Sequence, residues 1–314
     1  MTNLLLDLLP IIVVGISLGT LFGLAGLGYT VVINASQLIN FALGDLAVLG
    51  VGICWFSLTV AHMPLVVTVL LGIAGAGLYA LLIQKAIVDP LVQRGAAFFT
   101  VILGTMAMGT ISSGSVGVYT RFWWMRIDHF FGVEPIRIKG IFIDTQAGLI
   151  ICTTVVLVVA YWVFLNKTRW GVALRATGFN RDAALLAGIR TSRMVGLAFI
   201  MGGVISSIAG ILCAPLAAFN ANSGLPLAIN GFIALIVGGW GNPYAAVLGG
   251  VVLGLIRSLL TGYFSSTHAE VATFLVLMIV LQLKPKGLFP GFMMPKARKG
   301  KELTAPAKGV EHVR

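Results

Sequence analysis

Charge is scarce in this chain. Only 10% of its 314 residues are charged, whereas 58% are hydrophobic and the mean hydropathy is +1.01. A soluble chain carries about a quarter charged residues, so this composition excludes a water-facing globular surface. It fits a lipid bilayer, which about 20 consecutive apolar residues cross as a helix.

Reactive side chains are scarce as well. The three cysteines stand alone within apolar stretches, at Cys54, Cys152 and Cys213, with neither CxxC nor metal-ligand spacing. Isolated cysteines of this kind are typical of small buried hydrophobes. The four histidines are scattered along the chain, at His62, His129, His268 and His312. We therefore expect no metal site and no membrane-embedded enzyme, which would need such residues in a cluster.

A phosphate-binding loop is also missing. Gly300-Lys301 lacks both the upstream glycine and the following hydroxyl of G-x-x-x-x-G-K-[ST], the loop that cradles nucleotide phosphates. We expect the chain to hydrolyse no ATP and to hold no cofactor of its own.

Basic residues are absent from positions 1–10, which hold one acid, Asp7. A cleaved secretory signal has a basic start, so we expect the first hydrophobic segment to be retained and its start to lie outside the cell.

The net charge of +11 is concentrated in two places. Residues 284–314 hold eight basic and two acidic residues, or +6, and residues 166–193 hold six and one, or +5. Basic residues in short loops and tails mark the cytoplasmic side. No aromatic residues interleave with the basic ones in the tail, so we do not expect nucleic-acid binding.

Apolar stretches divide the chain into membrane elements. They cover about 8–33, 46–61, 65–84, 97–118, 146–165, 194–218, 231–238, 244–261 and 269–283. Runs of this length predict helices rather than barrel strands. We predict an all-α, polytopic transmembrane bundle of eight or nine elements, some broken or re-entrant. The count depends on whether 227–240 crosses. Residues 1–291 form one transmembrane domain, and 292–314 form a basic cytoplasmic tail.

The basic loop 166–193 contains a pattern typical of a short helix. Asn180 can cap its start, the anion of Asp182 suits the first turn, and Gly188 suits the C′ position. A helix this short is marginal in water, and its interior is apolar, so it needs a covering surface. That surface is a partner protein, the bilayer, or the rest of this chain. The candidate coupling residues are Arg175, Asn180, Arg181, Asp182, Ala183, Ala184, Leu185, Leu186 and Gly188.

A second unusual stretch is too polar for a lipid-facing helix and too apolar for an ordinary loop. Its candidate pathway residues are Asn34, Ser36, Gln37, Asn40, Phe41, Leu43, Gly44 and Asp45. Asp45 is the only acid of residues 34–61. Intramembrane charges are costly and mark functional sites; alternatively, Asp45 caps the second helix. A further break or pathway candidate is formed by Asn230, Gly238, Gly239, Trp240 and Gly241.

Several blocks resemble a known family. Arg175-Ala176-Thr177, Asp182-Ala183-Ala184 and Gly188-Ile189 resemble the coupling loop of bacterial ABC-importer permeases, and more closely the branched-chain amino acid permeases of the LivH type. The family's Asn-Phe-Ala-His-Gly-Asp/Glu block is similar to residues 40–45, where Leu43 replaces His. Its glycine-rich segment and its closing Pro-x-Gly-Leu-Phe are similar to residues 238–254 and 285–289.

The resemblance implies an inner-membrane permease subunit, and the charge distribution favours a periplasmic N-terminus. Its implied partners are a second, LivM-like permease, two cytoplasmic ATPases that bind ATP and Mg, and a periplasmic substrate-binding protein. The implied solutes are branched-chain amino acids, urea, short amides or aromatic acids, and Leu43 favours a bulkier or less polar one. Two alternatives remain: a transporter driven by an ion gradient through Asp45, Arg257 and Glu270, and a passive solute channel.

Overall fold

The computed structural model describes residues 2–130, 136–138, 141–143, 145–263 and 266–289, with side chains at 8–130, 145–263 and 269–289. The long helices are α1 (Thr2–Ser36), α2 (Leu43–Thr59), α3 (Leu65–Ile83), α5 (Phe98–Thr120), α6 (Thr145–Lys167), α9 (Thr191–Cys213), α10 (Gly224–Gly238), α11 (Pro243–Tyr263) and α12 (Ser266–Leu283). Shorter elements are the π-helix η1 (Gln84–Val88), α4 (Asp89–Gln93), α7 (Arg169–Phe179), α8 (Arg181–Leu186), the 3-10 turn η2 (Ala221–Ser223) and the strands β1 (Ile136–Ile138) and β2 (Ile141–Ile143).

Within the described residues, seven helices are long and apolar enough to cross a membrane. α2 and residues 269–283 of α12 are apolar but shorter. The predicted polytopic helical bundle is therefore confirmed in kind, while the count of eight or nine elements stays a prediction. A small antiparallel hairpin, β1–β2, adds to it and pairs Ile136 with Ile143.

Two stretches that we expected to be connectors are helical. Residues 84–93 continue α3 through η1 and α4. Pro90 stands at the start of α4, where its missing N–H does the least harm to a helix. The wider π-turn before it, in which the Asp89 N–H donates to the Gln84 carbonyl, keeps the chain helical up to this proline. In the basic loop, the prediction missed α7. Its apolar side, with Leu174 buried, packs on α1, α6 and α9, and its basic residues Arg169 and Arg175 are exposed.

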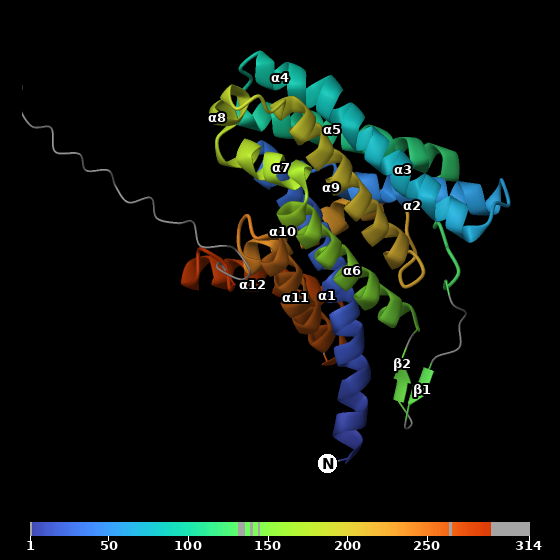
Figure 1. Ribbon diagram of the computed structural model, residues 1–314. Coiled ribbons are helices and arrows are strands. Elements are labelled where there is room, and N and C mark those ends of the chain that lie inside the picture. Colours follow the sequence, from blue (N-terminus) through green and yellow to red (C-terminus); the bar gives the residue numbers. More distant parts are fainter. Residues whose placement is uncertain (1, 131–135, 139–140, 144, 264–265, 290–314) are drawn as a thin grey trace, which may run out of the picture.

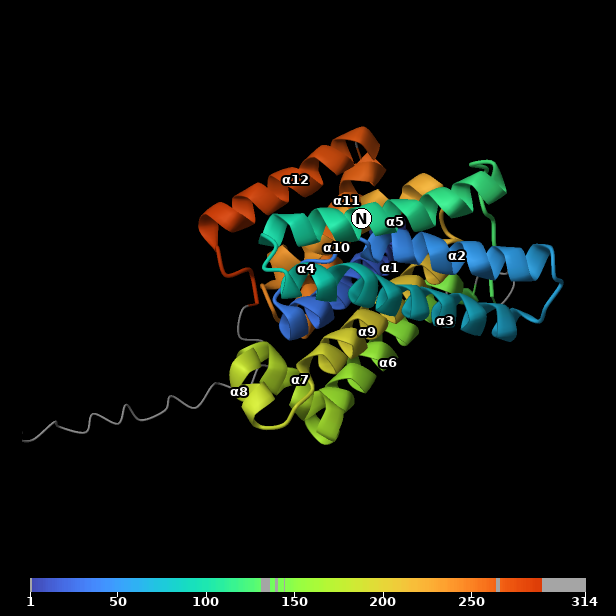
Figure 2. The ribbon, with the colours of Figure 1, turned by 90° about the horizontal axis from the view of Figure 1, so that it is seen from above.

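α1 is the central helix of the bundle, and Figure 2 shows the other helices arranged around it. It packs most extensively on α11. A Cβ atom at Gly23 would come within 2.8 Å of the Val247 Cα, and one at Gly15 within 3.0 Å of the Leu255 Cα. The four-residue glycine spacing of α1 thus allows the two backbones to approach closely, as small residues do in membrane helices.

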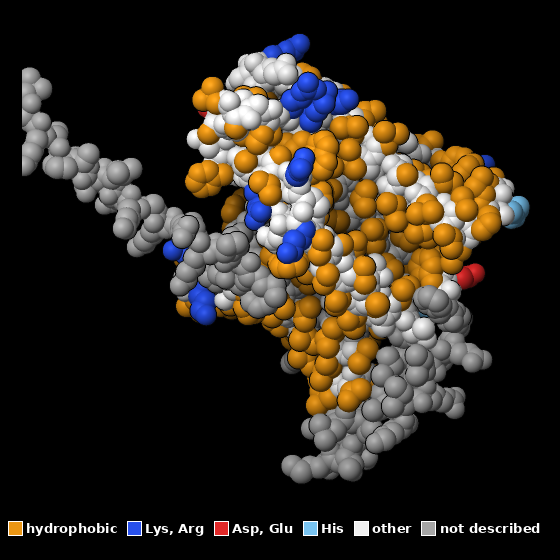
Figure 3. Space-filling model, viewed as in Figure 1, with side chains coloured by type: hydrophobic (Ala, Val, Ile, Leu, Met, Phe, Trp, Pro, Cys, Tyr) orange, Lys and Arg blue, Asp and Glu red, His pale blue; other side chains and the backbone are white. Residues whose placement is uncertain are grey.

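The molecule has two distinct ends. α4, α7 and α8 lie together at one end, which we call the loop end, whereas the start of α1 and the β1–β2 hairpin lie at the other (Figure 1). Figure 3 shows Lys and Arg side chains gathered towards the loop end and hydrophobic side chains over the flanks. A hydrophobic flank with basic residues at one end is the surface that a bilayer and its cytoplasmic face favour.

Candidate coupling loop and translocation pathway

α8 is a complete, capped helix. The Asn180 side-chain oxygen accepts a hydrogen bond from the Ala183 N–H at 3.0 Å, and Asp182 lies in the first turn. Gly188 follows with φ +79, the left-handed conformation that ends helices. The predicted cap, first turn and stop are confirmed, and the helix ends at Leu186 with Ala187 as its C-cap.

The described residues leave the apolar side chains around α8 uncovered. Leu186 is 90% exposed and Phe179, at the end of α7, is 92% exposed. Ala184 is buried, and the Arg181 Nε donates to the Thr191 hydroxyl at 3.4 Å, which ties α8 to α9. α8 therefore presents an apolar, solvent-facing tip at the loop end of the molecule. Among the described residues, only Ala184 of this helix is buried, so they do not provide the covering surface that the helix needs.

α7 joins this tip to the end of α1. Any side chain at Gly178 would collide with the Asn34 carbonyl oxygen, since a Cβ there would also lie 2.9 Å from the carbonyl carbon. The Gln37 side-chain amide donates to the Gly178 carbonyl at 3.2 Å. α7 and the end of α1 are thus in backbone contact, so a shift of one displaces the other.

The stretch of pathway candidates divides into two groups. Its first group lies at the loop end: Asn34 donates to the Gly241 carbonyl at 2.9 Å, and Ser36 donates to the Val32 carbonyl at 2.8 Å within α1. Gln37 has φ +58 and closes α1. These residues connect α1 to α7 and to the break between α10 and α11.

The second group lies deeper, where α2 and α10 begin. Asn40 is fully buried; its oxygen accepts from the Ala42 N–H at 3.1 Å, and its amide nitrogen has no partner among the described residues. Gly44 lies against Gly224, since a Cβ at Gly44 would be 2.9 Å from the Gly224 carbonyl carbon. Two helix N-termini, each a source of free N–H groups, therefore meet inside the bundle.

Asp45 occupies this junction. Its carboxylate oxygens lie beside Gly109 of α5 and Gly224 of α10. The N-cap position of α2 belongs to Ala42, without a side-chain cap bond. The alternative in which Asp45 caps α2 is thus not the geometry observed. The side chain is partly exposed, although its neighbours are apolar helices.

An aromatic cluster lies on the loop-end side of this junction. The Phe41 ring is 5.4 Å from the Phe232 ring and 6.0 Å from the Tyr29 ring, and Trp240 meets Phe232 at 6.3 Å. Phe41 and Trp240 are among the candidates predicted from the sequence, whereas Tyr29 and Phe232 are not. No sequence signal could have found these two, because ordinary aromatic residues in apolar helices are common.

The remaining candidates serve two structural purposes. Asn230 accepts from Arg257 at 3.4 Å, and Arg257 pairs with Glu270 at 3.4 Å, so these three residues join α10, α11 and α12. Gly238, Gly239 and Gly241 form the break before α11, where the Phe289 N–H donates to the Gly238 carbonyl at 2.8 Å.

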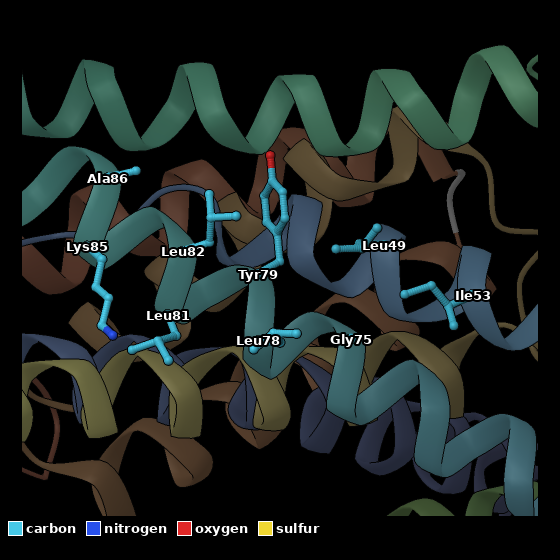
Figure 4. Close-up of a pocket in the computed structure, with 9 residues that line it drawn as sticks. All are labelled: Leu49, Ile53, Gly75, Leu78, Tyr79, Leu81, Leu82, Lys85 and Ala86. Carbon is cyan, nitrogen blue, oxygen red and sulfur yellow. The ribbon is translucent and has the colours of Figure 1, made fainter.

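A large groove between α2 and α3 lacks the features of a solute site. It has a volume of about 710 Å³ and is lined by apolar residues with one charge, Lys85 (Figure 4). The Tyr79 hydroxyl points away from it and donates to the Met108 carbonyl at 3.0 Å. Specific pockets contain convergent polar groups, so this groove is better suited to lipid chains. Among the described residues, no three metal-ligating side chains gather either.

The fold and these sites define a multi-pass helical membrane protein with a short, capped helix exposed on a loop between two spans. The chain belongs to the family described as branched-chain amino acid transport system / permease component, whose model matches residues 11–283. It is therefore a permease component of an ABC-type transport system, a class of protein that works with partner subunits.

Individual relatives agree with this assignment. The high-affinity branched-chain amino acid permease LivH of Escherichia coli K12 is 25% identical over 290 residues, covering 87% of this chain and 92% of LivH. BraD of Pseudomonas aeruginosa is 24% identical over 289 residues, covering 87% and 93%. The solved PsaBC complex from Streptococcus pneumoniae has a chain of similar fold, with a TM-score of 0.51 and 11% identity over 89% of this chain and 92% of that one.

Proposed function

We propose that the chain is one permease subunit of an ABC importer of the inner membrane. It forms half of the pathway for a small polar or amphipathic solute and pairs with a second, LivM-like permease. Two cytoplasmic ATPases, which bind the ATP and Mg, dock on α8, and a periplasmic binding protein delivers the solute. The loop end and the tail lie in the cytoplasm, and the N-terminus lies in the periplasm.

The observation that carries this proposal is the exposure of α8. A six-residue helix has little stability in water by itself. Yet this helix is capped at its start and presents Leu186 to solvent at the basic end of the molecule, where Phe179 at the end of α7 is exposed as well. Exposed apolar groups gathered on one loop mark a protein docking surface. The surface around α8 is as long as one or two helical turns.

The contacts of α7 supply the mechanical connection. Gly178 of α7 touches the backbone of Asn34, and Asn34 bonds the Gly241 carbonyl. A displacement of α7 and α8 by a bound ATPase therefore moves the end of α1 and the start of α11. Because α1 packs along α11, the shift reaches the bundle interior. ATP binding elsewhere then changes the populations of inward-facing and outward-facing states.

We assign the pathway to the junction of α2 and α10. Helix N-termini that end inside a membrane attract anionic groups of solutes, and the Asp45 carboxylate attracts cationic ones. A solute with both charges, such as an amino acid, suits this arrangement. The neighbouring rings of Phe41, Phe232 and Trp240 would contact a bulky aliphatic or aromatic side chain. An amide, urea or an aromatic acid would contact only some of these charged and aromatic groups.

The test is the variant Leu186→Asp in the transporter reconstituted with its ATPases and binding protein. A charge on the exposed tip should abolish stimulation of ATP hydrolysis by the solute-loaded binding protein and weaken co-purification of the ATPases. Leu186→Met, which keeps the apolar surface, is the matched control and should behave as wild type. Normal stimulation in Leu186→Asp would remove α8 from the docking surface, and uphill uptake by the chain alone would favour an ion-driven transporter.

A further inference from the structure

A cavity lined by both apolar and polar side chains lies at the loop end, on the side of α1 that faces α6 and α7. It has a volume of about 760 Å³ and is lined by residues of α1, α6, α7 and the start of α11. We call it the α7 cavity. Its polar lining includes Asn34, Gln37, Tyr161, Asn166, Arg175 and Tyr244. Trp162 and Phe179 supply aromatic walls. The pathway candidates around Asp45 do not line it.

One buried hydroxyl in this cavity has no partner. Tyr161 is 3% exposed, and no described residue forms a hydrogen bond with its hydroxyl. A buried polar group without a partner is costly, and native structures seldom contain one. Tyr244 and Arg175 line the same cavity as Tyr161. Tyr161 lines the α7 cavity, and a ligand there that reaches its hydroxyl would supply the missing partner.

The donors around this space suit an oxyanion. Arg175 is the cation of the described lining, and it uses one N–H on Asn166 at 3.2 Å, which leaves further N–H groups free to donate. The phenol hydroxyls of Tyr161 and Tyr244, the latter 7% exposed, add two neutral donors. One positive charge with two hydroxyl donors matches a singly charged oxyanion, because charge-assisted hydrogen bonds are the strongest kind.

The position of the cavity relative to the membrane indicates which oxyanion it binds. Trp162, 41% exposed near the end of α6, is typical of the membrane–water interface, where phospholipid phosphates lie. The cavity is also much larger than a bare ion, so it has room for the body that carries the charge. We propose that the α7 cavity binds a singly charged phosphate group, presented by a bilayer phospholipid or by a free phosphate ester.

This ligand would join α6, α7 and α11 at one point and hold α7 in place. The effect of this ligand on the docking loop rests on the function proposed above, whereas its binding to the α7 cavity does not. A bound phosphate should make the transmission from α8 to α1 more efficient, because α7 loses freedom to move independently.

Retained phospholipid tests the binding. The full-length chain, purified with the subunits that accompany it, is compared by native mass spectrometry as wild type, Tyr161→Phe, Tyr244→Phe and the double variant. Each single variant loses one donor to a charged group and should bind about tenfold more weakly. The control is Tyr263→Phe, at the opposite end of α11 and exposed, which should retain lipid as wild type does. Equal retention in the double variant would overturn the proposal.

The two phosphate sources are separated by thermal stability after delipidation. Short-chain phosphatidylglycerol and inorganic phosphate are added separately. A rise in melting temperature with the lipid alone identifies a headgroup site, and a rise with inorganic phosphate as well identifies a site open to free esters. Both rises should disappear in the double variant. No rise with either probe would refute the site.

The same preparations separate this inference from the proposed function. Leu186→Asp should lose ATPase stimulation while retaining phospholipid at the wild-type level. If ATP hydrolysis is stimulated normally in the Leu186→Asp complex, the docking assignment fails and the lipid measurement still stands. If the tyrosine variants retain lipid, the cavity assignment fails and the docking assignment still stands.

Discussion

Gly188 offers a direct test of how α8 is held. Its φ is +79, and a Cβ atom built there would meet nothing within 4 Å. The cost of a larger residue therefore comes from the backbone alone, about 1–2 kcal/mol for an L-residue in the left-handed region. Asparagine visits this region more readily, whereas valine is stiffer. We expect coupling to fall in the order Gly, Asn, Ala, Val.

The magnitude matters because so little holds this helix in place. The Asn180 cap contributes about 1 kcal/mol, and six residues give almost no stability of their own. A change of 1–2 kcal/mol alters the ratio of formed to frayed α8 by roughly 5- to 30-fold. We expect a loss of ATPase stimulation on that scale for Gly188→Val, with no change in membrane insertion.

The assay is solute-stimulated ATP hydrolysis by the reconstituted complex. Gly95 supplies a matched control, because it has φ +67, is equally unobstructed, and follows α4. Gly95→Val should store similar strain and leave stimulation near wild type. Equal stimulation across the Gly188 series, or an equal loss in Gly95→Val, would refute the claim that the backbone of Gly188 sets the shape of the docking helix.

Four further outcomes are expected. Asp45→Ala should slow transport in a flux assay without loss of ATPase co-purification; unchanged flux would remove Asp45 from the pathway. Asp182→Arg should uncouple the ATPase, because it places a cation at a helix N-terminus at a cost of about 0.3–1 kcal/mol; normal transport would contradict this. Gly178→Val should lower the melting temperature and the stimulation together, since overpacking costs about 1–3 kcal/mol; a neutral effect would exclude backbone contact between α7 and α1. Arg257→Gln should lower stability by at most about 1 kcal/mol, because the pair with Glu270 is partly exposed; a larger loss of transport than of melting temperature would place the pair in the pathway.

Local patterns allowed part of this protein to be predicted. Apolar runs marked most of the membrane helices, because backbone groups in a bilayer must bond within their own segment. Asn180 and Gly188 marked the ends of α8, because capping and a positive φ depend on a few adjacent residues. The helical course of 84–93 was missed, since Pro90 and charged residues resemble a connector until a π-turn accommodates them.

The sequence by itself determined the class of protein, the basic loop and the capped helix within it, because each depends on composition or on neighbours a few residues apart. Only the tertiary structure decided that Asp45 faces Gly109 and Gly224 and that Tyr161 lies with Arg175 beside a cavity. It also decided that Asn34 and Gln37 belong to the loop end. Such pairings arise from which helix faces meet, and those depend on the packing of distant segments, which no short pattern records.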